Sequence, residues 1–110
     1  MKIIDLNAAL KGLKQINDEI SYKSCFEEKN FTTGIITFQP QKNSDRKQIN
    51  HSDKDVVCHV LKGRGRLRVN GRRIQLSAGM ICHIPKGTPH DFAASQRSQL
   101  VLFYSLIQTS

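Results

Sequence analysis

Tryptophan is absent from this chain, and aromatic residues make up only 6% of its 110 residues. Any hydrophobic core must therefore consist mostly of aliphatic side chains. No apolar run approaches the ~18 residues that a membrane-spanning helix requires. The first residues lack the apolar stretch of a secretory signal. We therefore expect a protein with no membrane span and no secretory signal.

Cysteine is scarce, and its spacing matches no common motif. The chain has three cysteines, Cys25, Cys58 and Cys82, and none of them forms a Cys-x-x-Cys pair. An odd number without that spacing disfavours both a disulfide framework and a zinc ribbon. Free thiols are typical of reducing compartments, so the sequence predicts a cytoplasmic protein.

Acidic residues are also few: 9 Asp and Glu stand against 17 Lys and Arg, which gives a net charge of +8. Many of the cations lie close together, in a basic surface that comprises Arg64, Arg66, Arg68, Arg72 and Arg73. Alternation with Leu67 and Val69 predicts that Arg66 and Arg68 face solvent. No aromatic residues for base stacking and no helix-turn-helix pattern accompany them, which favours a solvated strand face that guards the sheet edge. An acidic partner or nucleic acid stays open as the alternative, with nucleic acid disfavoured.

The N-terminal segment, residues 1–20, is predicted to hold one helix over residues 5–20. Asp5 is suited to the N-cap, and Leu6, Leu10 and Leu13 recur at helical spacing. We expect this apolar stripe to pack against a sheet.

From residue 22 to residue 107 the pattern changes to short β-strands separated by turns. The expected strands are residues 31–38, 56–61, 66–69, 72–76, 80–84 and 100–107. Asn70-Gly71 between two alternating strands predicts a type I′ hairpin. Strands at this spacing with no helix between them predict a sandwich or barrel. Residues 41–55 are almost entirely polar and are expected to form a long surface loop. We expect the whole chain, 1–110, to form one domain.

Four residues near the middle of the strand region form a recognisable motif. Gly79 is followed after five residues by Pro85-x-Gly87, and His90 follows after two further residues, with Phe92 beyond it. With this motif, residues 51–92 resemble the cupin superfamily. The resemblance implies an all-β fold, a double-stranded β-helix or jelly-roll barrel with a short N-terminal helix. It also implies that His90 points into the barrel at a metal-binding position.

The other half of the cupin pattern is incomplete in this sequence. Counting back from Gly63 puts Val56 where the family has a glutamate, His51 at the second histidine and Ile49 at the first. This register keeps two ligands, His51 and His90. An alternative register uses His51, Asp53 and His90 as the two-histidine, one-carboxylate set that suits Fe(II). The resemblance thus leaves open a divalent metal (Fe, Mn, Ni or Zn) and a metal-free barrel.

Strand alternation places Val56 and Cys58 on the inner face and His59 and His83 on the outer face. The expected ligand pocket comprises Val56, Cys58, Cys82 and Phe92. Such a cavity is largely apolar and suits a small hydrophobic or mixed ligand. Cys58 is expected to act as a small buried hydrophobe, with a soft metal ligand or a reactive thiol as the alternatives.

Three functions follow from these features. The first is a barrel that binds a small molecule, with or without a divalent metal. The second is a metal-dependent cupin enzyme of the dioxygenase, isomerase or decarboxylase type. The third is an interaction module that uses the basic surface. The resemblance also implies a homodimer, with the outer face of the barrel or the N-terminal segment forming the contact.

Overall fold

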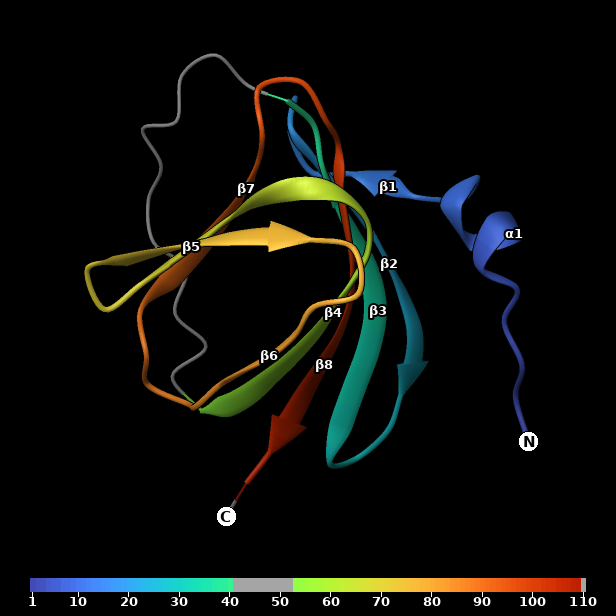
Figure 1. The fold of residues 1–110 in the computed structure, drawn as a ribbon. Coiled ribbons are helices and arrows are strands. Elements are labelled where there is room, and N and C mark those ends of the chain that lie inside the picture. Colours follow the sequence, from blue (N-terminus) through green and yellow to red (C-terminus); the bar gives the residue numbers. More distant parts are fainter. Residues whose placement is uncertain (41–52, 110) are drawn as a thin grey trace.

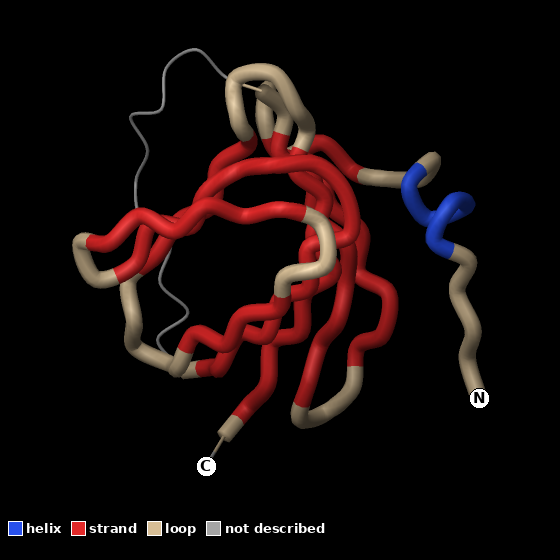
Figure 2. Tube along the Cα trace, viewed as in Figure 1, coloured by secondary structure: helices blue, strands red, loops and turns tan. Residues whose placement is uncertain are grey.

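The structure is a computed structural model that describes residues 1–40 and 53–109. Strands dominate the chain, and one short helix lies outside them (Figure 2). The elements are α1 (Leu6–Leu10), β1 (Lys14–Gln15), β2 (Ile20–Glu27), β3 (Phe31–Phe38), β4 (Lys54–Val69), β5 (Arg72–Ser77), β6 (Ile81–Ile84), β7 (His90–Ala94) and β8 (Leu100–Gln108).

All strand pairs among the described residues are antiparallel. Strand β4 pairs with β5, β6, β7 and β8. The strand order is β1-β2-β3-β8-β4-β5, and β6 and β7 also pair with β4. The first half of β4 lies between β8 and β6, and its second half lies between β5 and β7. The long strand therefore belongs to two sheets, which curve around a common interior (Figure 1). The prediction of an all-β jelly-roll barrel is confirmed.

The bend in β4 explains why the sequence predicted two strands where the structure has one. Pairing with β8 shifts by one residue between Val60 and Lys62, and Gly63 follows with a φ of +84°. A Cβ at Gly63 would lie 1.6 Å from the carbonyl oxygen of Gln99. Glycine at this position therefore lets the chain turn from one sheet into the other without leaving the strand.

The core is mostly aliphatic, as the composition predicts, and its residues alternate along the strands with residues that point outward. Register aligns Ile36 of β3, Leu102 of β8 and Val60 of β4, and all three point inward. The fully buried core residues Leu100 and Leu102 anchor β8 between its neighbours. The intervening residues of the same strands, such as Ile35 and Val101, point to the outer face.

The N-terminal helix is much shorter than predicted, because it spans five residues rather than residues 5–20. Its start agrees with the prediction, since the Ala8 N–H donates to Asp5 Oδ2 at 3.0 Å. The helix ends before Gly12, a poor helix former. Residues beyond it pair with β2, and Asn17 Oδ1 accepts hydrogen bonds from the Glu19 and Ile20 N–H groups. Sheet pairing thus overrides the helical spacing of the apolar residues.

Helix α1 packs on the outer face of the barrel. Ala9 is buried there against Ile35 of β3 and Val101 of β8. Figure 1 shows the helix beside β2 and outside the sheets. Within the described ranges, no helix is long and apolar enough to cross a bilayer.

The hairpin between β4 and β5 has the predicted turn. Asn70 and Gly71 have φ angles of +51° and +73°, which is the double positive φ of a type I′ turn. Arg68 and Arg73 then face each other across the strand pair.

Candidate functional site

A cavity of about 250 Å³ lies inside the barrel. Its wall is mostly apolar, and the residues in it that carry polar groups are one histidine, two tyrosines and one cysteine. The lining residues are Ile16, Tyr22, Ile36, Phe38, Val56, Cys58, His90, Phe92, Leu102, Tyr104 and Leu106. Three of the four residues expected in the pocket, Val56, Cys58 and Phe92, are among them. Ile16 is 58% exposed, so this part of the wall meets solvent.

His90 is the polar residue that the cupin-like motif aims into this cavity. The corner of Pro85 to Gly87, where Gly87 has a φ of +81°, turns the chain from β6 into β7. His90 is the first residue of β7 and only 3% exposed. Its Nδ1 lies 2.9 Å from the carbonyl oxygen of Thr88. Because a carbonyl only accepts, we assign a proton to Nδ1, which donates to Thr88.

Asp55, which the sequence did not single out, ties this corner to β4. The Lys86 N–H donates to Asp55 Oδ1 at 2.9 Å, and His83 Nε2 lies 3.2 Å from Oδ2. The hydrogen bond from Lys86 is the main cause that lowers the pKa of Asp55, and the His83 hydrogen bond adds to it. The carboxylate therefore holds in place the turn that leads to His90.

The lowered pKa of Asp55 predicts a pH-dependent contribution to stability. The contribution should be complete above the ordinary carboxyl pKa of 3.8 and should be lost as the pH falls through the lower pKa of the folded state. Denaturant unfolding of the wild type and of Asp55→Asn measured across the acid range checks this. The difference between the two proteins should be constant near neutrality and should shrink only below that ordinary value. A difference that grew towards acid pH would contradict the assignment.

The metal set expected from sequence is only partly described. His51 lies outside the described residues. Asp53 is exposed just before β4 and is not part of the cavity wall, while Val56 places an isopropyl group in that wall. Over residues 1–40 and 53–109, no group of three or more His, Cys, Asp or Glu side chains is placed to hold an ion. The described residues therefore do not by themselves make up a site of three or four protein ligands.

Cys82, the fourth residue expected in the pocket, lies beside Cys58 rather than in the cavity wall. The two residues are directly opposite each other on β4 and β6. Cys58 is buried, and the half-buried Cys82 packs against the core. A hydrogen bond between the thiols, helped by burial, raises the pKa of Cys58. The same hydrogen bond lowers the pKa of Cys82 to about 7.

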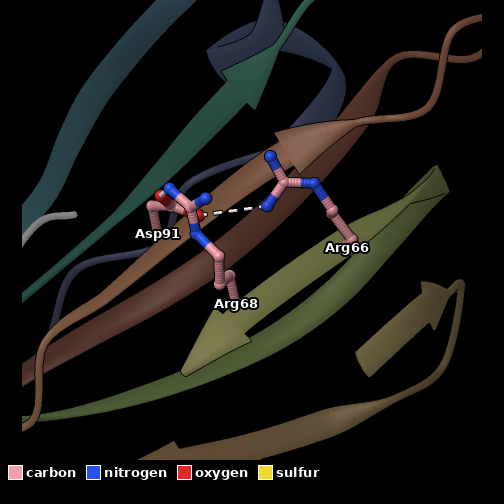
Figure 3. Close-up of polar contacts among 3 residues, drawn as sticks. All are labelled: Arg66, Arg68 and Asp91. Atoms are coloured by element: carbon pink, nitrogen blue, oxygen red, sulfur yellow. Dashed lines mark hydrogen bonds and ion pairs between the residues drawn. The ribbon is translucent and has the colours of Figure 1, made fainter. Parts of the chain in front are cut away.

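The basic surface differs from the prediction at its centre. Arg66 and Arg68 do lie on the outer face of β4, but they do not face open solvent. Arg66 Nη1 lies 3.1 Å from Asp91 Oδ1, and Arg68 Nη2 contacts Asp91 Oδ2 (Figure 3). The Asp91 side chain is only 2% exposed, and those of Arg66 and Arg68 are 14% and 22% exposed. The two arginines differ from the prediction because pairing of β4 with β7 puts Asp91 directly opposite Arg68.

The remaining members of the basic surface, Arg64, Arg72 and Arg73, are exposed. Register puts Arg73 on the face of Arg68, whereas Arg72 pairs with Val69 and projects from the opposite face. His59 and His83 are exposed, as alternation predicts. The five arginines thus do not form one uniform solvated ribbon.

The barrel topology and the cavity agree with a match to a family of known proteins. Residues 34–105, well over half of the chain, match the model of the cupin domain. The chain belongs to the cupin family. The matched region contains β4 to β7, the corner at Pro85 to Gly87 and His90. No match was found among curated proteins.

Solved structures share the fold of this cupin at low sequence identity. One is TT1209 from Thermus thermophilus, with a TM-score of 0.80 and 22% identity over 98% of each chain. Another is the polyketide cyclase RemF from Streptomyces resistomycificus, with a TM-score of 0.81 and 17% identity over 97% of this chain and 79% of that one. A predicted oxalate decarboxylase from Thermotoga maritima has a TM-score of 0.75 and 14% identity over 88% and 92% of the chains. At these identities the likeness shows the fold alone.

Proposed function

We propose that this cupin binds a small, largely apolar molecule inside the barrel, and that the ligand carries a hydroxyl group that hydrogen-bonds to His90. The observation that supports this is an apolar cavity of about 250 Å³ with one buried imidazole in its wall. A cavity with a few polar groups on apolar walls is the usual form of a small-molecule site.

The aromatic residues of the wall indicate the shape of the ligand. Phe38 and Phe92 lie with ring centroids 6.0 Å apart, and the His90 ring stands edge-on to Phe92 at 5.8 Å. Flat apolar surfaces of this kind favour a planar ring system. His90 is the histidine of this wall, and the nitrogen atoms of an imidazole can hydrogen-bond a hydroxyl group. A phenol-like molecule meets both requirements.

The test uses naphthol as the probe and naphthalene as its matched partner without a hydroxyl group. We expect naphthol to bind to the wild-type protein more tightly than naphthalene. His90→Phe keeps an apolar ring but removes the imidazole nitrogen atoms, so it should weaken naphthol about tenfold and leave naphthalene unchanged. Fluorescence titration measures both affinities.

A variant that fills the cavity controls for binding elsewhere. Val56→Phe enlarges a side chain in the wall and should abolish binding of both probes, while circular dichroism shows whether the barrel is intact. The proposal fails if naphthol does not bind, or if Val56→Phe leaves binding unchanged in a folded protein.

Metal content decides between this proposal and a metal-dependent enzyme. Elemental analysis of the purified protein should find no stoichiometric Fe, Mn, Ni or Zn. A stoichiometric ion that is lost in both His51→Ala and His90→Ala would replace the proposal with a metal site and would show that His51 completes it.

We also propose that the protein forms a homodimer through the outer face of the sheet that contains β2, β3, β8 and β4. A second cavity of about 260 Å³ opens on this face, and its lining is mostly apolar: Ile4, Leu6, Cys25, Phe26, Ile35, His59, Leu61 and Phe103. Ile81, opposite His59 and 70% exposed, extends the same face. Monomeric proteins rarely leave such a continuous apolar surface open, and a two-fold dimer covers it with its own copy.

The dimer is tested by light scattering after size exclusion. Ile81→Glu and Leu61→Glu each place a charge on the proposed contact and should convert a dimer to a monomer. Ile16→Glu is the control, because Ile16 is an exposed isoleucine at the barrel cavity rather than on the outer face. A wild-type monomer, or a dimer that resists both contact variants, would contradict the proposal.

A further inference from the structure

We propose that Cys58 and Cys82 form a dithiol that a hydroperoxide oxidises reversibly to a cross-strand disulfide between β4 and β6. The inference concerns a covalent modification and is independent of the ligand proposed above. It starts from the register of the two strands, where Cys58 and Cys82 are direct partners.

The register makes Cys58 and Cys82 directly opposed residues, a placement whose general geometry suits a disulfide. Directly opposed residues of antiparallel strands project on the same face, with Cα atoms about 4.5–5.5 Å apart. Disulfides need Cα atoms about 4.4–6.8 Å apart. Pairing at Cys58 and Cys82 is held in register by the hydrogen bond from the Val60 N–H to the Met80 carbonyl at 2.8 Å.

The surroundings of the two thiols differ in a way that assigns their roles. Cys82 is the more accessible residue, and Cys58 is almost completely buried. The hydrogen bond from Cys58 also favours the thiolate of Cys82, whose pKa falls to about 7. The reactive form of cysteine is the thiolate, so Cys82 is the residue that meets the peroxide first. Cys58 is the buried partner opposite Cys82, and it reacts in the second step.

The chemistry balances with one hydroperoxide molecule. The Cys82 thiolate attacks one peroxide oxygen, the O–O bond breaks, and Cys82 becomes a sulfenic acid while the released oxyanion takes up a proton. Cys58 Sγ then attacks Cys82 Sγ, the S–S bond forms, and the S–O bond breaks. The hydroxide leaves as water with the proton from Cys58. The two thiols lose two electrons in total, and the peroxide receives them.

The new bond would act on the part of the chain that leads to His90. Among the described strands, β6 pairs only with β4, and the corner that precedes His90 follows β6 directly. A covalent link from β6 to β4 would prevent this short edge strand from opening. Hydrogen exchange at the backbone amides of β6 should therefore slow on oxidation.

The experiment treats the reduced full-length protein with hydrogen peroxide and maps its cysteines by peptide mass spectrometry. We expect one cross-linked peptide pair, Cys58 with Cys82, that a dithiol reductant reverses. Cys58→Ser should instead accumulate sulfenic acid at Cys82, which a dimedone reagent traps. At pH 7 Cys82 should also react with iodoacetamide at least about tenfold faster than Cys25.

Cys25 supplies the matched control. It lines the cavity on the outer face, and burial raises the pKa of its thiol. Cys25→Ser should leave the cross-link unchanged. The proposal is overturned if peroxide oxidises Cys82 to sulfinic acid while Cys58 stays reduced, if the cross-link involves Cys25, or if no cysteine reacts in the folded protein.

Discussion

Asp91→Ala is expected to lower the free energy of unfolding by about 3–5 kcal/mol, because it removes an almost fully buried carboxylate that contacts two partly buried guanidinium groups. The carboxylate of Asp91 is shared by Arg66 and Arg68, one at each oxygen. Its side chain is almost fully buried, so water replaces it poorly. Urea unfolding should show a lower midpoint with an unchanged slope.

A compensated variant separates the loss of the charge pair from the loss of packing. Asp91→Leu combined with Arg66→Met and Arg68→Met removes all three charges and keeps apolar volume at each position. Replacement of a whole buried ion-pair group in this way is often neutral or stabilising. We therefore expect the triple variant to recover most of the stability that Asp91→Ala loses. Equal stability of Asp91→Ala and the wild type would show that the cluster contributes nothing.

Gly63→Ala is expected to destabilise the protein by about 2–5 kcal/mol, since it combines an unfavourable backbone conformation with a steric clash. The residue has a φ of +84°, and a Cβ would lie 1.6 Å from the Gln99 carbonyl oxygen. Relief of the clash requires β4 to move away from β8 at the point where β4 passes between the two sheets. Thermal and urea unfolding measure the loss.

Gly71→Ala is the matched control for the backbone conformation alone. Gly71 has a φ of +73°, but a Cβ there would meet nothing within 4 Å. The variant should cost only about 1–2 kcal/mol, the ordinary penalty of a left-handed residue that is not glycine. A loss as large as that of Gly63→Ala would show that the contact with Gln99 is unimportant.

Strand periodicity predicted a sandwich or barrel, and the resemblance of the glycine-proline motif to the cupin superfamily narrowed this to a jelly-roll barrel. Alternation with period two depends only on which face of a sheet is buried, so the inward direction of Val56 and Cys58 followed from the sequence. The sequence also predicted the turns at Asn70-Gly71 and before His90, because few residues tolerate those backbone conformations. Alternation thus predicted Val56 and Cys58 in the cavity wall, and the resemblance predicted His90 there.

Pairing between segments far apart in the chain decided the rest. The apolar spacing of residues 5–20 fits a helix, yet hydrogen bonds to β2 end the helix at Leu10. No local pattern shows that Asp91 would lie opposite Arg68, or that Asp55 would reach Lys86.

What the sequence by itself determined is the aliphatic core and the succession of strands, because these depend on local periodicity and backbone preference. The jelly-roll fold and the inward position of His90 followed from the resemblance of the glycine-proline motif to the cupin superfamily. Only the tertiary structure decided which charges are neutralised and which thiols meet. Arg66, Arg68 and Asp91, like Cys58 and Cys82, become neighbours through strand register. Register is set by the packing of the whole barrel, so the type of a residue does not show which residue of another strand will lie opposite it.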